Sequence, residues 1–380
     1  MKITEVETYI VRQKLDDAAQ FCYSQAWYKD RTLLLLRIRT DDGLEGWGEA
    51  FGPAFPHKET IDNIYAPHLI GKNPLDSEVI WMHLYNLMRD HGQKGLALEA
   101  QSAVDIALWD LKGKITGLPV YQLMGGAHRD LVLPYATGMY RRRDGSSLED
   151  VAAEARRHVD SGFRGIKIKI GFGSKYDVET VRAVRKEVGP DVMIMVDANH
   201  AYNATTAIHV GRKLEELDIT WFEEPVPPED IEGYKEVRRA LSIPVSGGEA
   251  EFTRFGFYRL LHERAVDIVQ PDCGVTGGIS EFLKIATLAS IHNTQCYPHV
   301  WGSGIALSVG LHCCFALPDF PPSLTPSPTM LECDRTPNVF REKLNKRPLP
   351  KNADGDLVKP EGPGLGVDVD MDLVDNTRVA

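Results

Sequence analysis

Eight short apolar runs recur from residue 132 onward, separated by segments in which apolar residues have helical spacing. A short apolar run bounded by turn residues is typical of a strand that is buried on both faces. Strands that alternate with helices predict a parallel sheet, and eight of them predict a (β/α) barrel. The runs are 132–137, 165–170, 192–197, 220–223, 245–249, 266–270, 295–299 and 329–332.

Proline limits the number of helices in this barrel. Residues 318–328 contain Pro318, Pro321, Pro322, Pro326 and Pro328, and the tail from 333 is rich in proline and glycine. Only seven helices fit, because proline interrupts helical hydrogen bonding. We therefore expect an α/β fold with a (β/α)7β barrel over residues 129–332, and a C-terminal segment, 333–380, that returns to the first domain.

The first 128 residues have a different pattern. Runs at 3–12, 32–40 and 44–50 predict a small antiparallel sheet, and helical spacing follows at about 58–70, 76–90 and 94–116. We therefore expect an N-terminal α+β capping domain over residues 1–128. The loop 15–30 is long and aromatic, which is typical of a functional lid, and we expect Tyr23 and Trp27 in it to bind substrate.

Composition narrows the class of protein. The 380 residues carry a net charge of -11, with 43% hydrophobic and 26% charged residues, as in ordinary globular proteins. This acidic balance argues against nucleic-acid binding. The longest aliphatic run, 33–36, is too short to cross a membrane, and the six cysteines have no zinc-binding spacing. We expect a cytoplasmic protein with no membrane partner and with reduced, buried cysteines.

Lys167 and Lys169 alternate with isoleucines in the run 165–170. Side chains alternate in direction along a strand, so both ammonium groups are expected on one face. Charged side chains are rarely buried without partners, so a barrel strand with two lysines requires nearby anions. From this run alone, a surface strand with a solvated lysine face is an equal alternative.

Acidic residues end several of the later runs. From Lys169 onward the charged run ends follow in steps of 23 to 33 residues. One β/α unit takes about thirty residues, so each step advances one strand and stays at the catalytic, C-terminal end of the barrel. Asp197, one glutamate of the pair Glu223-Glu224, and Glu249 then form an all-oxygen site that suits Mg²⁺. Only one glutamate of the pair can face the interior.

Two candidate bases flank this metal site. Asp272 and His299 end neighbouring runs, so the carboxylate can orient the imidazole and keep it basic. Lys169 is the second base if its pKa falls from about 10.4 toward about 7 to 8, a fall that Mg²⁺ and Lys167 favour. This set suits removal of the proton α to a carboxylate, with Mg²⁺, Lys167 and a protonated Glu332 stabilising the enediolate.

The motifs of this constellation resemble those of the enolase superfamily, mandelate racemase subgroup, along nearly the whole chain. A lysine or histidine base with Mg²⁺ is the known pattern of that superfamily. The motifs, in order, are Lys167-Ile-Lys169, Asp197-Ala-Asn199, Trp221-Phe-Glu223-Glu-Pro225, Gly248-Glu249, Pro271-Asp272, Pro298-His299 and Leu331-Glu332.

The resemblance implies a role for each of these residues. The Mg²⁺ ligands would be Asp197, Glu223 and Glu249. Lys167 and Glu332 would contact the substrate carboxylate. Lys169 would act on one face of the substrate, and His299, held by Asp272, would act on the other. Asn199 and His200 would be further contacts. The stretches 90–95, 135–138, 169–173, 197–200 and 299–302 are most similar to acid-sugar enzymes, such as galactarolactone cycloisomerases and aldonate or aldarate dehydratases.

These expectations describe a Mg²⁺-dependent lyase or isomerase of a small acid sugar, in a chain that we expect to form a homo-oligomer. A racemase or epimerase of a 2-hydroxy acid is the main alternative, because two opposed bases can also exchange a proton across one carbon. A Schiff-base aldolase that uses Lys169 and a non-catalytic barrel are further alternatives. The sequence leaves open the acid sugar and the stereochemistry at C2.

Overall fold

The computed structural model describes residues 1–143, 146–320 and 322–380. The N-terminal domain contains an antiparallel sheet in the order β1-β4-β5, formed by Ile3–Lys14, Asp30–Thr40 and Glu45–Ala50. Its helices are α1 (Ala54–Thr60), a π-helical turn (Ile61–Tyr65), α2 (Ala66–Leu69), α3 (Ser77–Met88), α4 (Leu96–Thr116) and α5 (Val120–Leu123). The three strands and the three helical segments agree with the sequence prediction to within a few residues.

Close packing joins α4 to the sheet of this domain. A Cβ on Gly46 or Gly48 of β5 would lie within 2.2 Å of the carbonyl oxygen of Ala107 or Ala103, so glycine lets the helix backbone approach the strand. The buried apolar residues of α4 include Ala100, Ala103, Val104, Ala107, Leu108 and Leu111, the stripe expected from their spacing.

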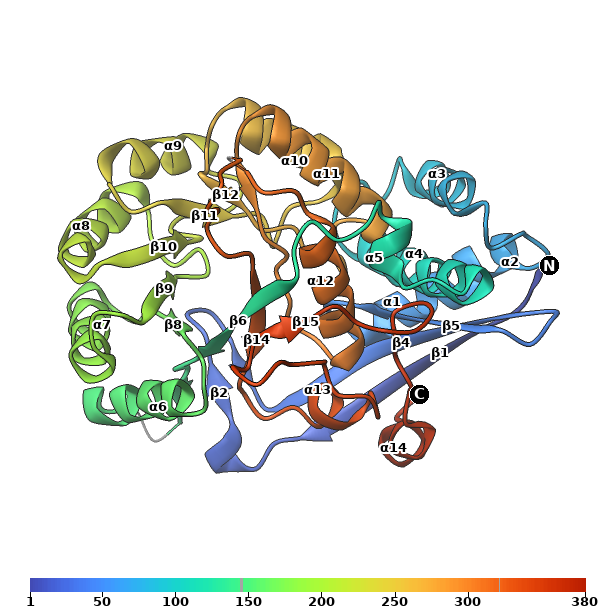
Figure 1. Ribbon diagram of the computed structural model, residues 1–380, viewed down its shortest axis with the longest axis horizontal. Coiled ribbons are helices and arrows are strands. Elements are labelled where there is room, and N and C mark those ends of the chain that lie inside the picture. Colours follow the sequence, from blue (N-terminus) through green and yellow to red (C-terminus); the bar gives the residue numbers. More distant parts are fainter. Residues whose placement is uncertain (144–145, 321) are drawn as a thin grey trace.

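A curled parallel sheet of eight strands forms the second domain, in the order β13-β12-β11-β10-β9-β8-β6-β14 (Figure 1). The strands in chain order are β6 (Leu131–Gly138), β8 (Gly165–Lys169), β9 (Met193–Asp197), β10 (Ile219–Glu223), β11 (Val245–Gly247), β12 (Ile268–Val269), β13 (Gln295–Cys296) and β14 (Met330–Asp334). The helices between them are α6 (Leu148–Asp160), α7 (Ser174–Val188), α8 (Ala204–Leu214), α9 (Ile231–Ala240), α10 (Thr253–His262), α11 (Ile279–Ile291) and α12 (Gly304–Ala316). This is the expected (β/α)7β succession.

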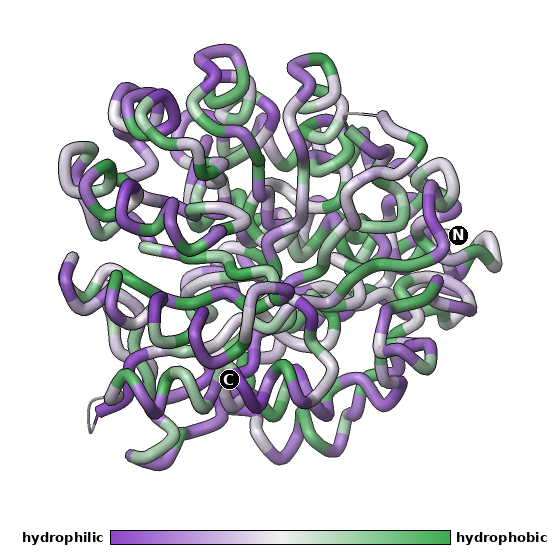
Figure 2. The backbone as a smooth tube through the Cα atoms, turned by 60° about the vertical axis from the view of Figure 1, so that its left-hand side comes forward, coloured by the Kyte–Doolittle hydropathy of each residue, from purple (hydrophilic) through white to green (hydrophobic). Residues whose placement is uncertain are grey.

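Alternation along β8 sorts its side chains between two environments. Ile166, Ile168 and Ile170 join the apolar layer between strands and helices. Lys167 and Lys169 point the other way and are 0% and 7% exposed. Figure 2 shows the outer helices alternating between hydrophilic and hydrophobic positions, as expected for helices that cover a sheet on one side. The solvated lysine face is therefore ruled out.

The C-terminal segment lies against the N-terminal domain. It contains α13 (Val339–Lys343), β15 (Leu357–Val358) and α14 (Met371–Thr377). The Ile10 amide of β1 donates to the Ala380 carbonyl at 2.9 Å, and the Val379 amide donates back to Ile10 at 2.8 Å. The chain ends on the first strand of the sheet, and this return completes the capping domain.

The N-terminal domain also contacts the C-terminal ends of the barrel strands. The loop 15–30 contains two short paired strands, β2 (Phe21–Cys22) and β3 (Trp27–Tyr28), and β2 also pairs with β7 (Arg141–Arg142) after β6. From this loop Ser24 Oγ donates to the Ala198 carbonyl at 2.9 Å, and Gln25 Nε2 donates to the Asn199 carbonyl at 2.7 Å. The loop therefore covers the barrel mouth.

Several smaller features differ from the sequence prediction. Three strands are shorter than the predicted runs 245–249, 266–270 and 295–299. Their paired residues end before Glu249, Gln270 and His299, so these residues lie in the loops after β11, β12 and β13. All six cysteines are free, but Cys296 and Cys333 are partly exposed rather than buried. Pro321 lies outside the described residues. None of the helices in the described part of the chain has the length and apolarity to span a bilayer.

Candidate active site

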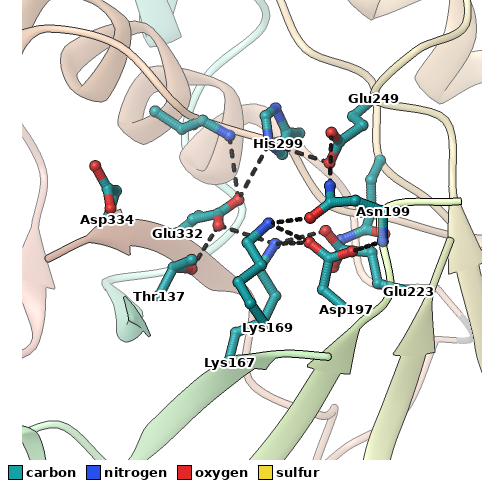
Figure 3. A network of polar contacts seen from close by, with 12 residues as sticks. Thr137, Lys167, Lys169, Asp197, Asn199, Glu223, Glu249, His299, Glu332 and Asp334 are labelled. Carbon is teal, nitrogen blue, oxygen red and sulfur yellow. Dashed lines mark hydrogen bonds and ion pairs between the residues drawn. The ribbon is translucent and has the colours of Figure 1, made fainter. Parts of the chain in front are cut away.

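Three carboxylates meet where β9, β10 and β11 end (Figure 3). Asp197 and Glu223 are the last residues of their strands and are partners in the ladder, and Glu249 stands two residues beyond β11. One oxygen of each lies within 4.8 Å of the others. Three oxygen ligands at this separation match the donor set that Mg²⁺ prefers.

Lys167 and Lys169 supply the positive charge beside this cluster. Lys167 Nζ lies 2.5 Å from Glu223 Oε1 and 2.9 Å from Glu332 Oε1, and Lys169 Nζ lies 2.5 Å from Asp197 Oδ2. The two lysines are thus the buried cations that the alternating run 165–170 predicts, with the anions that their burial requires.

The expected fall in the pKa of Lys169 depends on bound Mg²⁺ and stays a prediction, whereas the residues around Lys169 act in the opposite direction. Burial is the largest single effect and disfavours its ammonium form, but the Asp197 carboxylate together with Tyr140 and Glu249 outweighs burial and raises the pKa of Lys169 well above its ordinary value. Glu223 and Glu332 likewise overcome burial and raise the pKa of Lys167. Anions at 2.5 Å therefore dominate over the mutual repulsion of the two lysines.

His299 lies on the other side of the cluster, between two carboxylates. Its Nδ1 is 2.7 Å from Asp272 Oδ2, and the two residues also form a parallel backbone bridge. Its Nε2 is 3.2 Å from Glu249 Oε2, an ion pair whose angles fall short of a hydrogen bond. Burial lowers the pKa of His299, but Glu249, Glu332 and Asp272 together raise it to about 10.

The neighbours of Glu332 favour its ionised form, and the expected protonation of Glu332 stays a prediction. Burial favours its neutral form, but Lys167 and His299 outweigh burial and hold the pKa of Glu332 below its ordinary value. Thr137 Oγ1 adds a hydrogen bond at 2.5 Å. The Glu332 carboxylate therefore balances the charge of Lys167.

Of the two adjacent glutamates, Glu223 joins the carboxylate cluster, and Glu224 supports His200. Glu224 has a φ of 43°, so strand geometry ends at Glu223. Glu224 Oε2 lies 3.0 Å from His200 Nδ1. Burial opposes charge on His200, but Glu224 raises its pKa to about 9. Asn199 bridges the cluster, because its Oδ1 accepts from Lys169 at 2.9 Å.

A cavity of about 510 Å³ opens over these residues. Lys169, Asn199, His200, Glu249 and His299 form its barrel side. The predicted substrate contact Tyr23 lines it, whereas Trp27, the other predicted contact, does not. Trp27 is 44% exposed, and its neighbour Tyr28 lines the cavity instead, since neighbours on a strand face opposite sides.

Besides Tyr28, sequence reasoning missed three further aromatic residues of this cavity. Tyr140 follows β6 and places its ring centroid 5.4 Å from Lys169 Nζ. Phe51 and Trp301 pack together, with ring centroids 5.8 Å apart. Tyr140 lies two residues after the end of β6, and Trp301 lies two residues after His299. A search for residues close to predicted strand ends could therefore have found both. No comparable sequence signal marks Phe51.

Comparison with known proteins identifies the family. Residues 5–125 match the mandelate racemase / muconate lactonizing enzyme N-terminal domain, and residues 150–373 match the enolase C-terminal domain-like family. The chain belongs to the enolase superfamily. Within this superfamily it falls in the mandelate racemase subgroup, and it is 42% identical to the D-galactarolactone cycloisomerase of Agrobacterium fabrum, over 100% of this chain and 99% of that protein.

Two solved structures of enolase-superfamily enzymes are similar along the whole chain. The 3,6-anhydro-D-galactonate cycloisomerase of Zobellia galactanivorans has a TM-score of 0.90 and 41% identity, with both chains fully covered. A racemase from Streptomyces coelicolor A3(2), solved with bound magnesium, has a TM-score of 0.88 and 29% identity, covering 99% of this chain and 100% of that one. The family resemblance and the barrel with its capping domain are thus confirmed, and the chain is an enzyme of this superfamily.

Proposed function

We propose that this enzyme removes the proton α to the carboxylate of an acid sugar and completes a β-elimination, as a cycloisomerase or a dehydratase. One observation carries the proposal. Lys169 and His299 reach the same cavity from β8 and from the loop after β13, which four strands separate in the sheet. Two proton-transfer groups on opposite sides of a carboxylate cluster suit proton removal and proton delivery on one substrate.

The carboxylate cluster fits Mg²⁺ as its cofactor. Asp197, Glu223 and Glu249 offer only oxygen donors, and Glu249 Oε2 is buried and accepts no hydrogen bond from the described residues. Bound Mg²⁺ would act as a Lewis acid toward the substrate carboxylate. Asp197 is also the ion-pair partner of Lys169. A metal ion held by the Asp197 carboxylate would therefore weaken the ion pair that raises the pKa of Lys169.

Lys169 and His299 divide the two proton transfers. One of them takes the α proton, and the electron pair of the broken C–H bond forms an enediolate. The enediolate then expels the oxygen on the neighbouring carbon, and the other group donates a proton to that oxygen. Lys167 stabilises the negative charge of the enediolate, and Asp272 fixes Nδ1 of His299 so that Nε2 faces the cavity.

The two domains would have different roles in the reaction. The barrel, residues 129–332, holds the acid, base and ligand residues. We infer that residues 1–128, completed by 333–380, select the substrate, because Tyr23 and Tyr28 line the cavity from that domain. Asn199 and His200 complete the binding site from the barrel side.

The direct test is a proton NMR screen of acid sugars and their lactones in D₂O with Mg²⁺. The proposal expects loss of the α-proton signal together with an α-keto acid that reacts with semicarbazide, and expects EDTA to abolish both. Activity that survives EDTA would contradict the metal assignment and would favour a Schiff-base lysine.

The same screen separates elimination from racemisation. A racemase would incorporate deuterium at C2 and invert that carbon without forming a keto acid. Such a result would replace the elimination with a simple exchange between Lys169 and His299, and would leave the site assignment standing.

A further inference from the structure

Arg31 is a buried arginine that the proposed proton transfers do not use. It lies near the start of β4 in the N-terminal domain, and only 3% of its surface is exposed. Removing a guanidinium from water is costly unless other groups replace the water. The groups around Arg31 therefore indicate the role of this charge.

The anion that pairs with Arg31 lies on the last strand of the barrel. Arg31 Nη2 is 3.0 Å from Asp334 Oδ2, and Asp334 is 2% exposed. Asp334 follows Glu332 by two residues on β14, so both side chains leave the same face of the strand. Figure 3 shows Asp334 on the far side of Glu332 from the carboxylate cluster. The ion pair therefore joins the capping domain to the strand that carries Glu332.

Aromatic rings at the cavity surround the same guanidinium. The guanidinium carbon of Arg31 lies 3.9 Å from the ring centroid of Trp301 and 5.7 Å from that of Phe21. Trp301 lines the cavity, and Phe21 belongs to the loop 15–30 over the barrel mouth. Arg31 is therefore next to the cavity wall without being one of its described lining residues.

Neutralising Asp334 does not by itself account for the position of Arg31. Arg341 Nη1 already pairs with Asp334 Oδ2, at 2.6 Å. Arg31 Nη1 is buried and has no hydrogen-bond partner among the residues that the structure describes. A planar guanidinium that lies over an indole ring is favourable, most of all where water is excluded. The stacking on Trp301 therefore explains why a second arginine is buried here.

The Trp301 ring depends on packing for its position. Its Nε1 is buried and donates no hydrogen bond to the described residues. The ring centroids of Tyr28 and Phe51 lie 4.8 Å and 5.8 Å from that of Trp301, and the Phe51 ring lies 6.0 Å from the His299 ring. A shift of the indole ring would therefore change the shape of the cavity wall beside His299.

We propose that Arg31 is a positioning residue that holds the Trp301 ring in the cavity wall, with its ion pair to Asp334 fixing the guanidinium relative to the barrel. A lysine would keep the charge beside Asp334 but would not stack, because an ammonium is a compact point charge. Without the stacking the indole ring is free to turn, and the substrate binds less tightly. Proton transfer would change less, because Arg31 pairs with Asp334 and not with Lys169 or His299 in the described part of the chain.

Arg31→Lys tests this role, and Arg341→Lys is the matched control. Both arginines pair with Asp334, and Arg31 is the one of the two that lies over Trp301. We expect KM to rise about tenfold in Arg31→Lys with kcat within about threefold of wild type, and we expect both constants to change by less than about twofold in Arg341→Lys. Equal KM values in the two variants would overturn the proposal, because pairing with Asp334 would then be the whole role of Arg31.

This kinetic comparison rests on the proposed function. Its probe is the compound that the Mg²⁺-loaded wild-type enzyme turns over fastest among galactaro-1,4-lactone, 3,6-anhydrogalactonate and galactonate. If the wild-type enzyme turns over none of them, the proposed function fails, and a measurement without substrate still decides the role of Arg31.

Quenching of tryptophan fluorescence by acrylamide is that measurement. The chain has six tryptophans, so each protein is compared with its Trp301→Leu counterpart, and the difference isolates the emission of Trp301. We expect acrylamide to quench this emission more strongly in Arg31→Lys than in wild type or Arg341→Lys. Equal quenching in the three proteins would overturn the proposal, because Arg31 would not fix the ring.

Trp301→Leu alone keeps the proposal testable if Arg31→Lys does not fold. This variant removes the ring that Arg31 is proposed to hold, so KM should rise about tenfold or more. An unchanged KM in Trp301→Leu would overturn the proposal, because the wall would then contribute nothing to substrate binding.

Discussion

His299 depends on its neighbours for both its position and its charge. Asp272 holds Nδ1 at 2.7 Å, and Glu249 and Glu332 lie 3.2 and 3.8 Å from Nε2. These carboxylates overcome burial and raise the pKa of His299 to about 10. The proton of this imidazole is therefore controlled by residues from three further strand ends.

Asp272→Asn separates orientation from charge at His299. The amide keeps the size of the carboxylate but removes its charge, so the pKa of His299 should fall and turnover should drop by roughly 10²- to 10⁴-fold. The pH-rate profile and an NMR titration of the His299 ring measure both effects. An unchanged pH profile with full activity would show that Asp272 does not act through His299, and an unchanged thermal midpoint would exclude misfolding as the cause.

Single residues were predictable where strand geometry decides their direction. Lys167, Lys169 and Asp197 lie on strands, and their spacing alone predicts that they share one end of the barrel. The position of Trp27 outside the cavity was not predictable, because its direction depends on a two-residue strand that the sequence does not reveal. The ionised form that Lys167 favours at Glu332 was not predictable, because it depends on the distance between the two residues, which sequence does not encode.

At the scale of elements, buried carboxylates join the capping domain to the barrel helices. Asp105 of α4 accepts hydrogen bonds from the Ser280 amide at 2.9 Å and the Ser280 hydroxyl at 2.6 Å, at the start of α11. Burial raises the pKa of Asp105 to about 7, although those hydrogen bonds oppose the rise. Glu49 of β5 binds the start of α12 in the same way, through the Ser303 amide at 2.8 Å.

The raised pKa of Asp105 predicts a pH-dependent stability. The folded chain binds this proton below about pH 7, whereas the unfolded chain binds it only below its ordinary value of 3.8. Between these values the folded state holds more protons, so rising pH destabilises it. Asp105→Asn should reduce the loss of stability between about pH 5 and about pH 8 by on the order of 1 kcal/mol or more. Thermal midpoints at both pH values measure it.

An exposed aspartate provides the control for that measurement. Asp160 at the end of α6 has a side chain that is 64% exposed, so Asp160→Asn should keep the wild-type pH dependence. Parallel curves for wild type and Asp105→Asn would show that Asp105 does not bind a proton in this window.

The order of the elements was predictable, but the ends of the strands were not. Apolar runs and helical spacing identify eight strands and seven helices, because burial on both faces requires those patterns. Glu249 and His299 stand beyond ladders of three and two residues. Sequence cannot distinguish the last paired residue from the first loop residue when both are buried.

At the scale of the whole molecule, the C-terminal segment stabilises the capping domain and α12 together. Leu365 is 1% exposed and packs in one cluster with Trp109, Val120 and Cys313. Its amide donates to Asp110 Oδ1 at 2.8 Å, and its carbonyl accepts from Ser308 Oγ at 2.5 Å. The return of the tail was predictable from its proline and glycine content, but its contacts were not, because they join residues far apart in sequence.

Leu365→Ala tests whether this segment is part of the fold. Removing a buried leucine side chain should lower the free energy of unfolding by about 2 to 5 kcal/mol, read as a lower denaturant midpoint. Leu324→Ala is the matched control, because Leu324 is fully exposed and its truncation should leave the midpoint unchanged. Equal midpoints for the two variants would mean that the segment is not required for stability.

The expected homo-oligomer remains a prediction, which sedimentation analysis can check.

The measurement that tests the central claim most directly is α-proton exchange in D₂O by the variants Lys169→Ala and His299→Asn. NMR monitors the exchange on a substrate of the wild-type enzyme. We expect both variants to lose keto-acid formation by at least about 10²-fold. We expect only one of them to keep exchange of the α proton, because one residue removes that proton and the other delivers a proton to the leaving oxygen. Full turnover by either variant would contradict the assignment of Lys169 and His299 as the two proton-transfer groups.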